Sequence, residues 1–262
     1  MHRQKVVSCP RFVHFFGPDG AGKSTQVDLL VSKLKSNGTN VKKCWIRSPH
    51  TLAFLLSMFF LRIGFYRVSS TSIGRCDMFP ATNYEPKHGN VPPWDIRVNP
   101  WRGTILNREG NVVVLERIPL VNRSVLLRWF WAAIELVSVL PLIIYRVYFQ
   151  LFLGYILVAE RYVIDTIVTI AYFIDDFGFL YSPLATALLY CIPKDSAFIY
   201  LDSSYETMIK RRGINVEVRC FIEFQRKAYS ILANHLEALM IDTSRLSVEE
   251  TSAIISRYVG LG

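Results

Sequence analysis

The sequence predicts an α/β protein whose core is a five-stranded parallel sheet with helices on both faces. Two observations lead to this fold class. Short apolar runs typical of strands alternate along the chain with segments of helical periodicity, the order that parallel sheets require. A glycine-rich segment, 17–22, also joins the first strand-like run to the first helical one. The 262 residues suit one large domain that contains an insertion.

The first predicted elements are a strand, a glycine loop and a helix. Residues 11–17 have the apolar run of a buried strand. Apolar residues then recur every three or four positions over 22–36, which predicts a helix. A second strand over 41–47 and an apolar helix near 52–66 are expected to follow.

Residues 69–118 differ from the rest of the chain in composition. Five prolines and three glycines punctuate 74–103, and prolines at this density block helix interiors and central strands. Apolar runs at 104–106 and 112–115 flank a five-residue loop and predict a hairpin. We therefore interpret 69–118 as a partly irregular insertion near the substrate side of the domain, and a disordered segment is the alternative.

The C-terminal half alternates again between helices and strands. A long helix is predicted over 122–150, with a bend at Pro141. Two Ser-x-x-Glu sequences, which start at Ser203 and Ser247, predict capping boxes at helix N-termini. The other expected elements are helices near 163–174, 183–191 and 217–237 and strands over 155–161, 196–202 and 239–242.

Residues 125–158 form a strongly apolar stretch. Arg128, Glu135 and Arg146 interrupt it, whereas a membrane-spanning helix needs about 20 residues with few charges. We favour a buried helix, or the interface of a homodimer formed through apolar helices. A helix that lies on a membrane surface and a helix that spans the membrane are the alternatives.

The charge and the cysteines bear on partners and compartment. The net charge of +9 suits an anionic ligand such as a nucleotide, and a solvated basic surface accounts for much of the excess. The sequence has no zinc-ligand spacing and no tight basic run with interleaved aromatics, so we expect no nucleic-acid partner. The five cysteines are scattered and form no C-x-x-C pair, which favours reduced thiols and a cytoplasmic location.

One motif carries most of the functional prediction. Gly17, Gly22, Lys23 and Ser24 match G-x-x-x-x-G-K-[ST], the pattern of the phosphate-binding P-loop. Glycines allow backbone N–H groups to surround a polyphosphate, and the following helix directs its positive end toward the same anion. Lys23 would reach the β- and γ-phosphates, and the Ser24 hydroxyl would bind Mg²⁺. A glycine turn without a ligand is the alternative.

A second charged group, Glu160-Arg161, stands at the carboxyl end of a predicted strand. Ligands of open α/β sheets bind at that edge. A carboxylate there can hold Mg²⁺, and an arginine can grip a phosphate through two N–H groups. Asp165 falls in the first turn of the next predicted helix, where an acid also serves as a capping charge. The alternative interpretation of Glu160-Arg161 is a surface ion pair.

Four blocks in this order resemble the thymidylate kinase family. They are 17–26, Glu160-Arg161-Tyr162, Tyr200-Leu201-Asp202 with 210–212, and 224–229 before Ile241-Asp242. The resemblance implies a three-layer P-loop NTPase fold, a single kinase domain over 1–262, and ATP and Mg²⁺ as cofactors. It implies transfer of a phosphoryl group from ATP to a nucleoside monophosphate, foremost dTMP to give dTDP.

The resemblance also implies roles on the side of the phosphate donor. Ser24 and Glu160 would hold Mg²⁺, although the family usually has Asp at the second position. Arg211 and Arg212 would begin a mobile lid, 203–220, over ATP. The residues that would hold the ATP phosphates are Gly17, Asp19, Gly20, Ala21, Gly22, Lys23, Ser24 and Thr25.

On the acceptor side, the resemblance implies that Arg161 and Arg47 contact the acceptor phosphate and that Asp19 faces the acceptor sugar. Asp165 would add to this side, where nucleotide kinases often carry Ser or Thr. The sequence departs from the family after Arg47, and the residues that read thymine have no match in 52–150. Three functions stay open: a nucleoside monophosphate kinase, a kinase of the same fold for a sugar- or lipid-linked acceptor, and an ATP-binding regulatory protein without transfer.

Overall fold

The chain divides into two compact units. The computed structural model describes residues 10–46, 97–99, 104–106, 112–113, 124–174, 176–212 and 219–261. Arg47, the predicted helix 52–66 and residues 213–218 of the predicted lid lie outside these described residues. Unit 1 contains Met1–Arg47, Leu140–Val168 and Phe179–Gly262, and unit 2 contains Ser48–Val139 and Thr169–Gly178.

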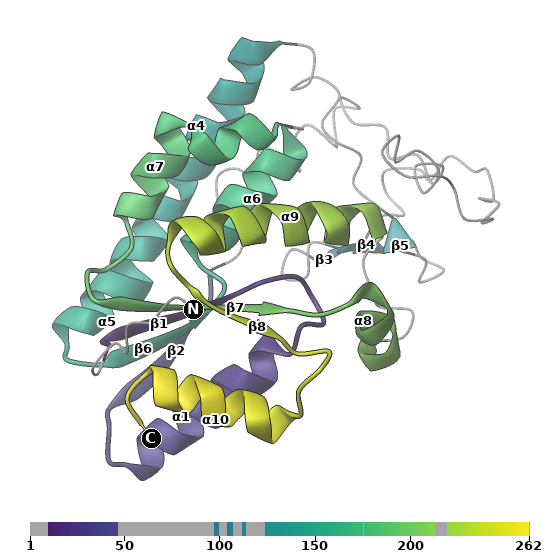
Figure 1. Ribbon diagram of the computed structural model, residues 1–262. Helices are drawn as coiled ribbons and strands as arrows, with labels where there is room; N and C mark the ends of the chain where they lie inside the picture. The colour runs from purple at the N-terminus through teal and green to yellow at the C-terminus, as the bar shows by residue number, and fades with distance from the viewer. Residues whose placement is uncertain are drawn as a thin grey trace. The chain divides into compact units, whose positions relative to one another are not determined.

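Unit 1 is built on a five-stranded sheet in which every strand pair is parallel, which confirms the α/β class and the sheet predicted from the sequence. The strand order is β2-β6-β1-β7-β8. Because β1 is central and its neighbours come from later in the chain, the loop after β1 lies at the middle of the sheet's carboxyl edge, where parallel strands end (Figure 1). The strands are β1 (Phe12–Phe16), β2 (Val41–Cys44), β6 (Ile156–Glu160), β7 (Ser196–Asp202) and β8 (Leu239–Asp242).

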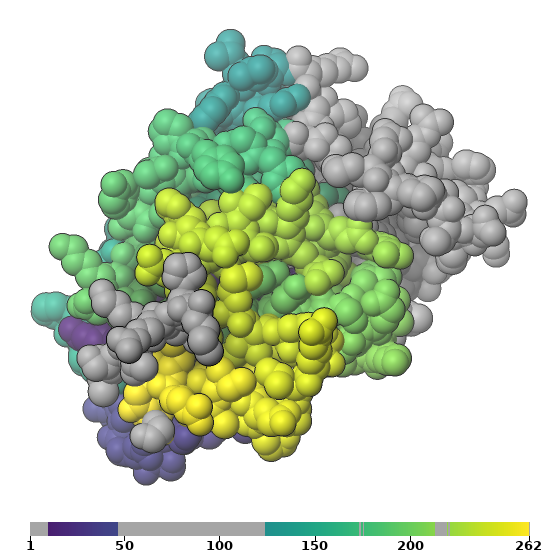
Figure 2. All heavy atoms as spheres, in the orientation of Figure 1, coloured from purple at the N-terminus to yellow at the C-terminus, as the bar shows by residue number. Residues whose placement is uncertain are grey.

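Helices cover both faces of this sheet. On one face lie α1 (Lys23–Ser36) and α10 (Val248–Tyr258), and on the other lies α9 (Arg219–His235) (Figure 1). The space-filling view shows the side chains of α9 and α10 over much of the face toward the viewer (Figure 2). Because successive side chains of a strand point to opposite faces, β1 contributes to the packing on both sides of the sheet. Val13 and Phe15 join the aliphatic cluster that includes residues of α1, whereas His14 and Phe16 contact aromatic rings on the opposite face.

Unit 1 contains three further short helices. They are α7 (Pro183–Tyr190), α8 (Tyr205–Arg212) and the short α5 (Phe149–Phe152). The predicted capping box of Ser247 and Glu250 is confirmed at the start of α10. The box predicted from Ser203 is wrong by one residue: the buried Ser203 does not cap α8, and the hydroxyl of Ser204 accepts from the Thr207 N–H at 3.2 Å.

Unit 2 contains a small antiparallel sheet of three short strands, β3 (Arg97–Asn99), β4 (Thr104–Leu106) and β5 (Val112–Val113). The predicted hairpin is confirmed, since Ile105 lies opposite Val113. β3 adds a third strand that the proline-rich composition did not predict. The helices α4 (Val125–Ile143) and α6 (Val163–Phe173) run through the unit boundaries.

The long helix predicted over 122–150 is instead three consecutive segments. α4 passes into a π-helical segment, Ile144–Tyr148, and then into α5. Pro141 lies inside α4 and cannot donate to its hydrogen-bond ladder, and the wider turn begins three residues later. The whole run, Val125–Phe152, is long and apolar enough to cross a membrane by length and composition, and 33% of its most apolar window is buried. A core helix of a soluble protein meets the same criteria.

Gly17 gives a testable constraint of this fold. Its φ is +138°, and a Cβ at this position would lie 2.1 Å from the carbonyl oxygen of Leu201 in β7. Because both groups belong to the main chain, neither can rotate away. We expect Gly17→Ala to lower the free energy of unfolding by at least about 2 kcal/mol in urea titrations.

Gly38→Ala is the matched control. Gly38 also has a positive φ, +75°, but no atom of the described residues lies within 4 Å of the place that a Cβ would occupy. Only the left-handed backbone should cost stability there, about 1 kcal/mol. Equal losses in the two variants would contradict the close approach of the loop to β7.

Candidate functional site

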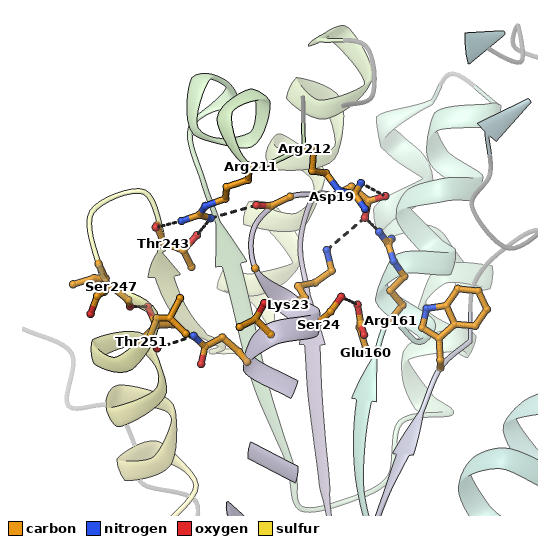
Figure 3. Close-up of a pocket in the computed structure, with 17 residues that line it drawn as sticks. Asp19, Lys23, Ser24, Glu160, Arg161, Arg211, Arg212, Thr243, Ser247 and Thr251 are labelled. Atoms are coloured by element: carbon orange, nitrogen blue, oxygen red, sulfur yellow. Dashed lines mark hydrogen bonds and ion pairs between the residues drawn. The ribbon is translucent and has the colours of Figure 1, made fainter. Parts of the chain in front are cut away.

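A cavity of about 480 Å³ opens at the carboxyl edge of the sheet in unit 1. The glycine-rich loop, 17–22, and the first turn of α1 form its centre (Figure 3). The ends of β6 and α8, Trp45 after β2, the turn after β8 and the start of α10 form its walls. The lining residues are Asp19, Gly20, Gly22, Lys23, Ser24, Thr25, Gln26, Trp45, Glu160, Arg161, Arg211, Arg212, Thr243, Leu246, Ser247, Val248 and Thr251.

The glycine-rich loop folds around the ammonium group of Lys23. Lys23 Nζ donates to the carbonyl oxygens of Gly17 and Pro18 at 2.7 and 2.8 Å, and it lies 3.7 Å from Asp19 Oδ1. The side chain is buried, with 4% of its surface exposed. Gly22 precedes α1 in a left-handed conformation, so the N-terminal amides of the helix follow the loop directly. The positive end of α1 and the lysine therefore meet at one place.

Ser24 and Glu160 come together from α1 and β6. The hydroxyl of Ser24 donates to Glu160 Oε1 at 2.5 Å (Figure 3). A hydroxyl and a carboxylate are oxygen ligands of the kind that Mg²⁺ prefers. Among the described residues, no cluster of three or more His, Cys, Asp or Glu side chains could hold a metal. Such a sparse pair fits Mg²⁺ that is bound jointly with phosphate oxygens, because Mg²⁺ keeps few protein ligands at such sites.

Arg161 occupies a strained position at the end of β6. Its φ of +70° is left-handed, yet its N–H donates to the carbonyl of Phe15 and its carbonyl accepts from the N–H of Ile46. Its guanidinium forms an ion pair with Asp19 and lies 3.3 Å from Asp165 Oδ1. The left-handed backbone costs about 1 kcal/mol or more, so the surrounding hydrogen bonds and ion pairs must hold it.

Asp165 lies beneath the cavity and does not line it. Its carboxylate is 1% exposed and accepts from the Tyr162 N–H at 3.1 Å and from the Tyr229 hydroxyl at 2.8 Å. Burial favours the neutral form of Asp165, but the neighbouring His14, Arg161 and Lys23 outweigh it, so the pKa of Asp165 is lowered. The structure thus gives Asp165 a supporting position under Arg161.

His14 is the other titratable group under the site. Its imidazole is fully buried, and Nε2 lies 3.6 Å from Asp165 Oδ2, which is longer than a hydrogen bond. Rings of Phe16 and Tyr162 pack against it. Burial lowers the pKa of His14 below 6.5, although the carboxylate of Asp165 opposes this shift.

Arg211 and Thr243 connect α8 to the turn after β8. Arg211 Nη1 donates to the Thr243 hydroxyl at 2.9 Å, and Nη2 donates to the Thr243 carbonyl at 2.6 Å. The same hydroxyl lies 3.1 Å from the carbonyl of Ala21. Arg212 reaches the other side of the loop, with Nη1 3.4 Å from Asp19 Oδ2 (Figure 3). Two consecutive arginines therefore bracket the glycine-rich loop.

None of the residues in the turn after β8 and at the start of α10 is predicted from the sequence as a site residue, although Ser247 is predicted as a helix cap. Gln26 Nε2 donates to the carbonyl of Val248 at 2.9 Å and so attaches this wall of the cavity to α1. Since the carboxyl ends of all parallel strands meet at one edge, the position after Ile241-Asp242 could have identified it. The residues concerned are Thr243, Leu246, Ser247, Val248 and Thr251.

The lining of the cavity is strongly cationic. Lys23, Arg161, Arg211 and Arg212 face two carboxylates, those of Asp19 and Glu160, which leaves two positive charges in excess. Of the residues singled out from the sequence, Gly17, Ala21 and Asp165 do not line the cavity, and Arg47 lies outside the described residues. The others meet there: Asp19, Gly20, Gly22, Lys23, Ser24, Thr25, Glu160, Arg161, Arg211 and Arg212.

Comparison of the chain with protein-family models finds no matching family, and comparison with curated proteins finds no match.

The burial of His14 predicts a pH dependence of stability. Because the folded-state pKa lies below the unfolded value of 6.5, the unfolded chain binds more protons as the pH falls below that value. We expect the free energy of unfolding to decrease from about pH 7 to about pH 5, by at most about 1.4 kcal/mol per pH unit from this group. The carboxylate of Asp165, with its lowered pKa, stays ionised over this range.

His14→Phe should flatten the dependence, because it removes the titrating group from an aromatic environment. His235→Gln, at an exposed position in the last turn of α9, is the control and should leave the slope unchanged. Urea titrations at both pH values measure the slopes, and a His14→Phe slope equal to that of the wild type would refute the assignment.

Proposed function

We propose that this protein transfers a phosphoryl group from ATP to a nucleoside monophosphate, as a divergent member of the thymidylate kinase family with a P-loop fold. The observation that carries the proposal is the convergence of four cations on a loop of main-chain amides at the N-terminus of α1. Phosphoryl transfer demands positioning and charge neutralisation more than covalent chemistry, and this site offers both. The preferred acceptor is dTMP.

The phosphates of the donor, ATP, would bind at the glycine-rich loop. The main-chain N–H groups of 20–24 and Nζ of Lys23 would bind the β- and γ-phosphates, with the positive end of α1 behind them. Gly17 and Ala21 act through the backbone, since they shape the loop without lining the cavity. Ser24 and Glu160 would hold Mg²⁺, which supplies neutralisation of phosphate charge when bound.

The purine base of ATP would lie between Arg211 and the start of α10. The guanidinium of Arg211 is held in place by two hydrogen bonds to Thr243, so one face of its plane can stack on a ring. Leu246 and Val248 supply apolar surface in the same cavity. Arg212, beside the loop, is placed to neutralise charge on the transferring phosphoryl group when α8 closes.

The acceptor phosphate belongs at Arg161. Its guanidinium presents five N–H donors. The carboxylates of Asp19 and Asp165 pair with it and so fix the orientation of its plane. A phosphate can replace Asp19 as the ion-pair partner of Arg161 and be held by two N–H groups, and Asp19 can then accept from a sugar hydroxyl. In the reaction, an acceptor phosphate oxygen forms the new bond to the γ-phosphorus, and the bond to the β,γ-bridging oxygen breaks. Arg161 orients the attacking group, and Lys23 stays with the leaving oxygen.

A second candidate shares the donor side and differs in the acceptor. Transfer to a sugar- or lipid-linked phosphate is favoured by the exposed apolar side chains of Ile144–Tyr148 and α5, which a soluble nucleotide would not need. An ATP-binding regulatory protein is the third alternative.

A coupled assay of ADP release against nucleoside monophosphates, sugar phosphates and a polyprenyl phosphate separates the three. We expect turnover that depends on both ATP and Mg²⁺ and that is highest with dTMP. Turnover with only a non-nucleotide acceptor would establish the second candidate. ATP binding without turnover on any acceptor would reject transfer.

Lys23→Ala tests the donor side. We expect kcat to fall by on the order of a hundredfold or more, because a preorganised cation next to the transferred group is lost. Lys33→Ala, at an exposed position of the same helix, is the control and should keep wild-type kcat. Circular dichroism checks that both variants fold, and near-normal kcat in folded Lys23→Ala protein would exclude the proposed role.

A further inference from the structure

An aromatic and aliphatic stripe lies exposed along Ile144–Tyr148 and the adjoining α5 of unit 1. We define the stripe as Ile144, Tyr145, Tyr148, Phe149, Phe152 and Leu153, whose side chains are between 42% and 86% exposed. The spacing follows successive helical turns, so all six share one side of the helical run. On the opposite side, Ile143 and Val147 are buried. An exposed apolar surface of this kind marks a site of interaction.

Two cations from other elements bond to the helical run Ile144–Phe152, and a third, Arg146, belongs to it. Arg11 Nη2 donates to the carbonyl of Leu151 at 2.5 Å, and Arg146 Nη1 donates to the carbonyl of Trp45 at 2.8 Å. Lys42 Nζ donates to Gln150 Oε1 at 2.9 Å and sits 3.7 Å above the ring of Tyr155.

The helical run itself carries little negative charge. The sequence has no Asp or Glu between Glu135 and Glu160. Within the part of the chain that the structure describes, no carboxylate pairs with Arg11, Lys42 or Arg146. Among these described residues the stripe is therefore bordered by cations, the pattern of helices that lie in the headgroup region of anionic bilayers.

Two other occupants fit this pattern less well. A helix that spans a bilayer meets lipid or other helices around its circumference, whereas this run buries Ile143 and Val147 and bonds to β2 through Lys42 and Gln150. A second copy of the chain, docked by two-fold symmetry on the same stripe, would bring its own Arg11 and Lys42 against those of the first. Like charges without compensating carboxylates would oppose that contact.

We propose that this stripe docks the protein on the surface of an anionic lipid bilayer. Phe149, Phe152 and Leu153 enter the boundary between headgroups and acyl chains, Tyr145 and Tyr148 sit at headgroup level, and Arg11 and Lys42 bind lipid phosphates. The inference goes beyond the proposed phosphoryl transfer and does not depend on it, because lipid binding is measured without ATP or an acceptor.

Vesicle flotation of the full chain tests the proposal. The probes are vesicles of phosphatidylcholine alone and of phosphatidylcholine with about one-third phosphatidylglycerol. We expect the protein to float with the anionic vesicles, to be released in about 0.5 M NaCl, and to float poorly with the neutral ones. Phe149→Ser/Phe152→Ser should weaken binding at least tenfold, because the two exposed rings no longer leave water. Arg11→Gln/Lys42→Gln should remove the preference for anionic vesicles.

The matched control is Leu29→Ser/Tyr181→Ser, which removes two exposed apolar side chains elsewhere in unit 1 and should leave vesicle binding unchanged. Thermal unfolding verifies that each variant folds. Absence of flotation would overturn the proposal, as would equal flotation of Phe149→Ser/Phe152→Ser and wild-type protein. Binding that withstands both salt and alkaline carbonate would indicate a span and would also overturn it. So would light scattering that shows a lipid-free dimer, which the Phe149→Ser/Phe152→Ser variant converts to a monomer.

Discussion

The buried ammonium of Lys23 is the constraint around which the site is built. An ammonium group out of water is costly unless it is hydrogen-bonded and an opposite charge lies nearby. The carbonyls of Gly17 and Pro18 accept hydrogen bonds from Lys23, and the carboxylate of Asp19 forms an ion pair with it, so the loop must bend back over the side chain. Only glycine can occupy position 17 in this bend, because a Cβ atom at Gly17 would collide with the carbonyl oxygen of Leu201. One charge thus sets the path of the loop between β1 and α1.

The charge of Lys23 also links the loop to the buried groups below it. Asp19 joins Lys23 to Arg161, and Arg161 leads to Asp165, which is anchored by Tyr229 from α9. Elements from both faces of the sheet therefore fix the orientation of one guanidinium. In the proposed reaction this rigidity matters, because an arginine that is already oriented loses little freedom when it binds a phosphate.

The sequence predicts the elements whose signals are local. The apolar run of β1, the helical spacing in α1 and the Ser247–Glu250 capping box are each contained in a few neighbouring residues, and the structure has them all. What the sequence does not predict depends on distant contacts. The burial of Asp165 requires Tyr229, which is 64 residues away, and the role of Thr243 as a partner of Arg211 requires β8 to end beside α8. The π-helical segment after Pro141 likewise reflects packing that periodicity does not reveal.

A crystal structure with a non-hydrolysable ATP analogue and Mg²⁺ tests the central claim most directly. We expect the β-phosphate to lie about 3 Å from the main-chain nitrogens of the glycine-rich loop, with Nζ of Lys23 moved from the carbonyls of Gly17 and Pro18 onto phosphate oxygens. Phosphates bound at another surface, or a loop that keeps its lysine on the two carbonyls at saturating analogue, would contradict the account.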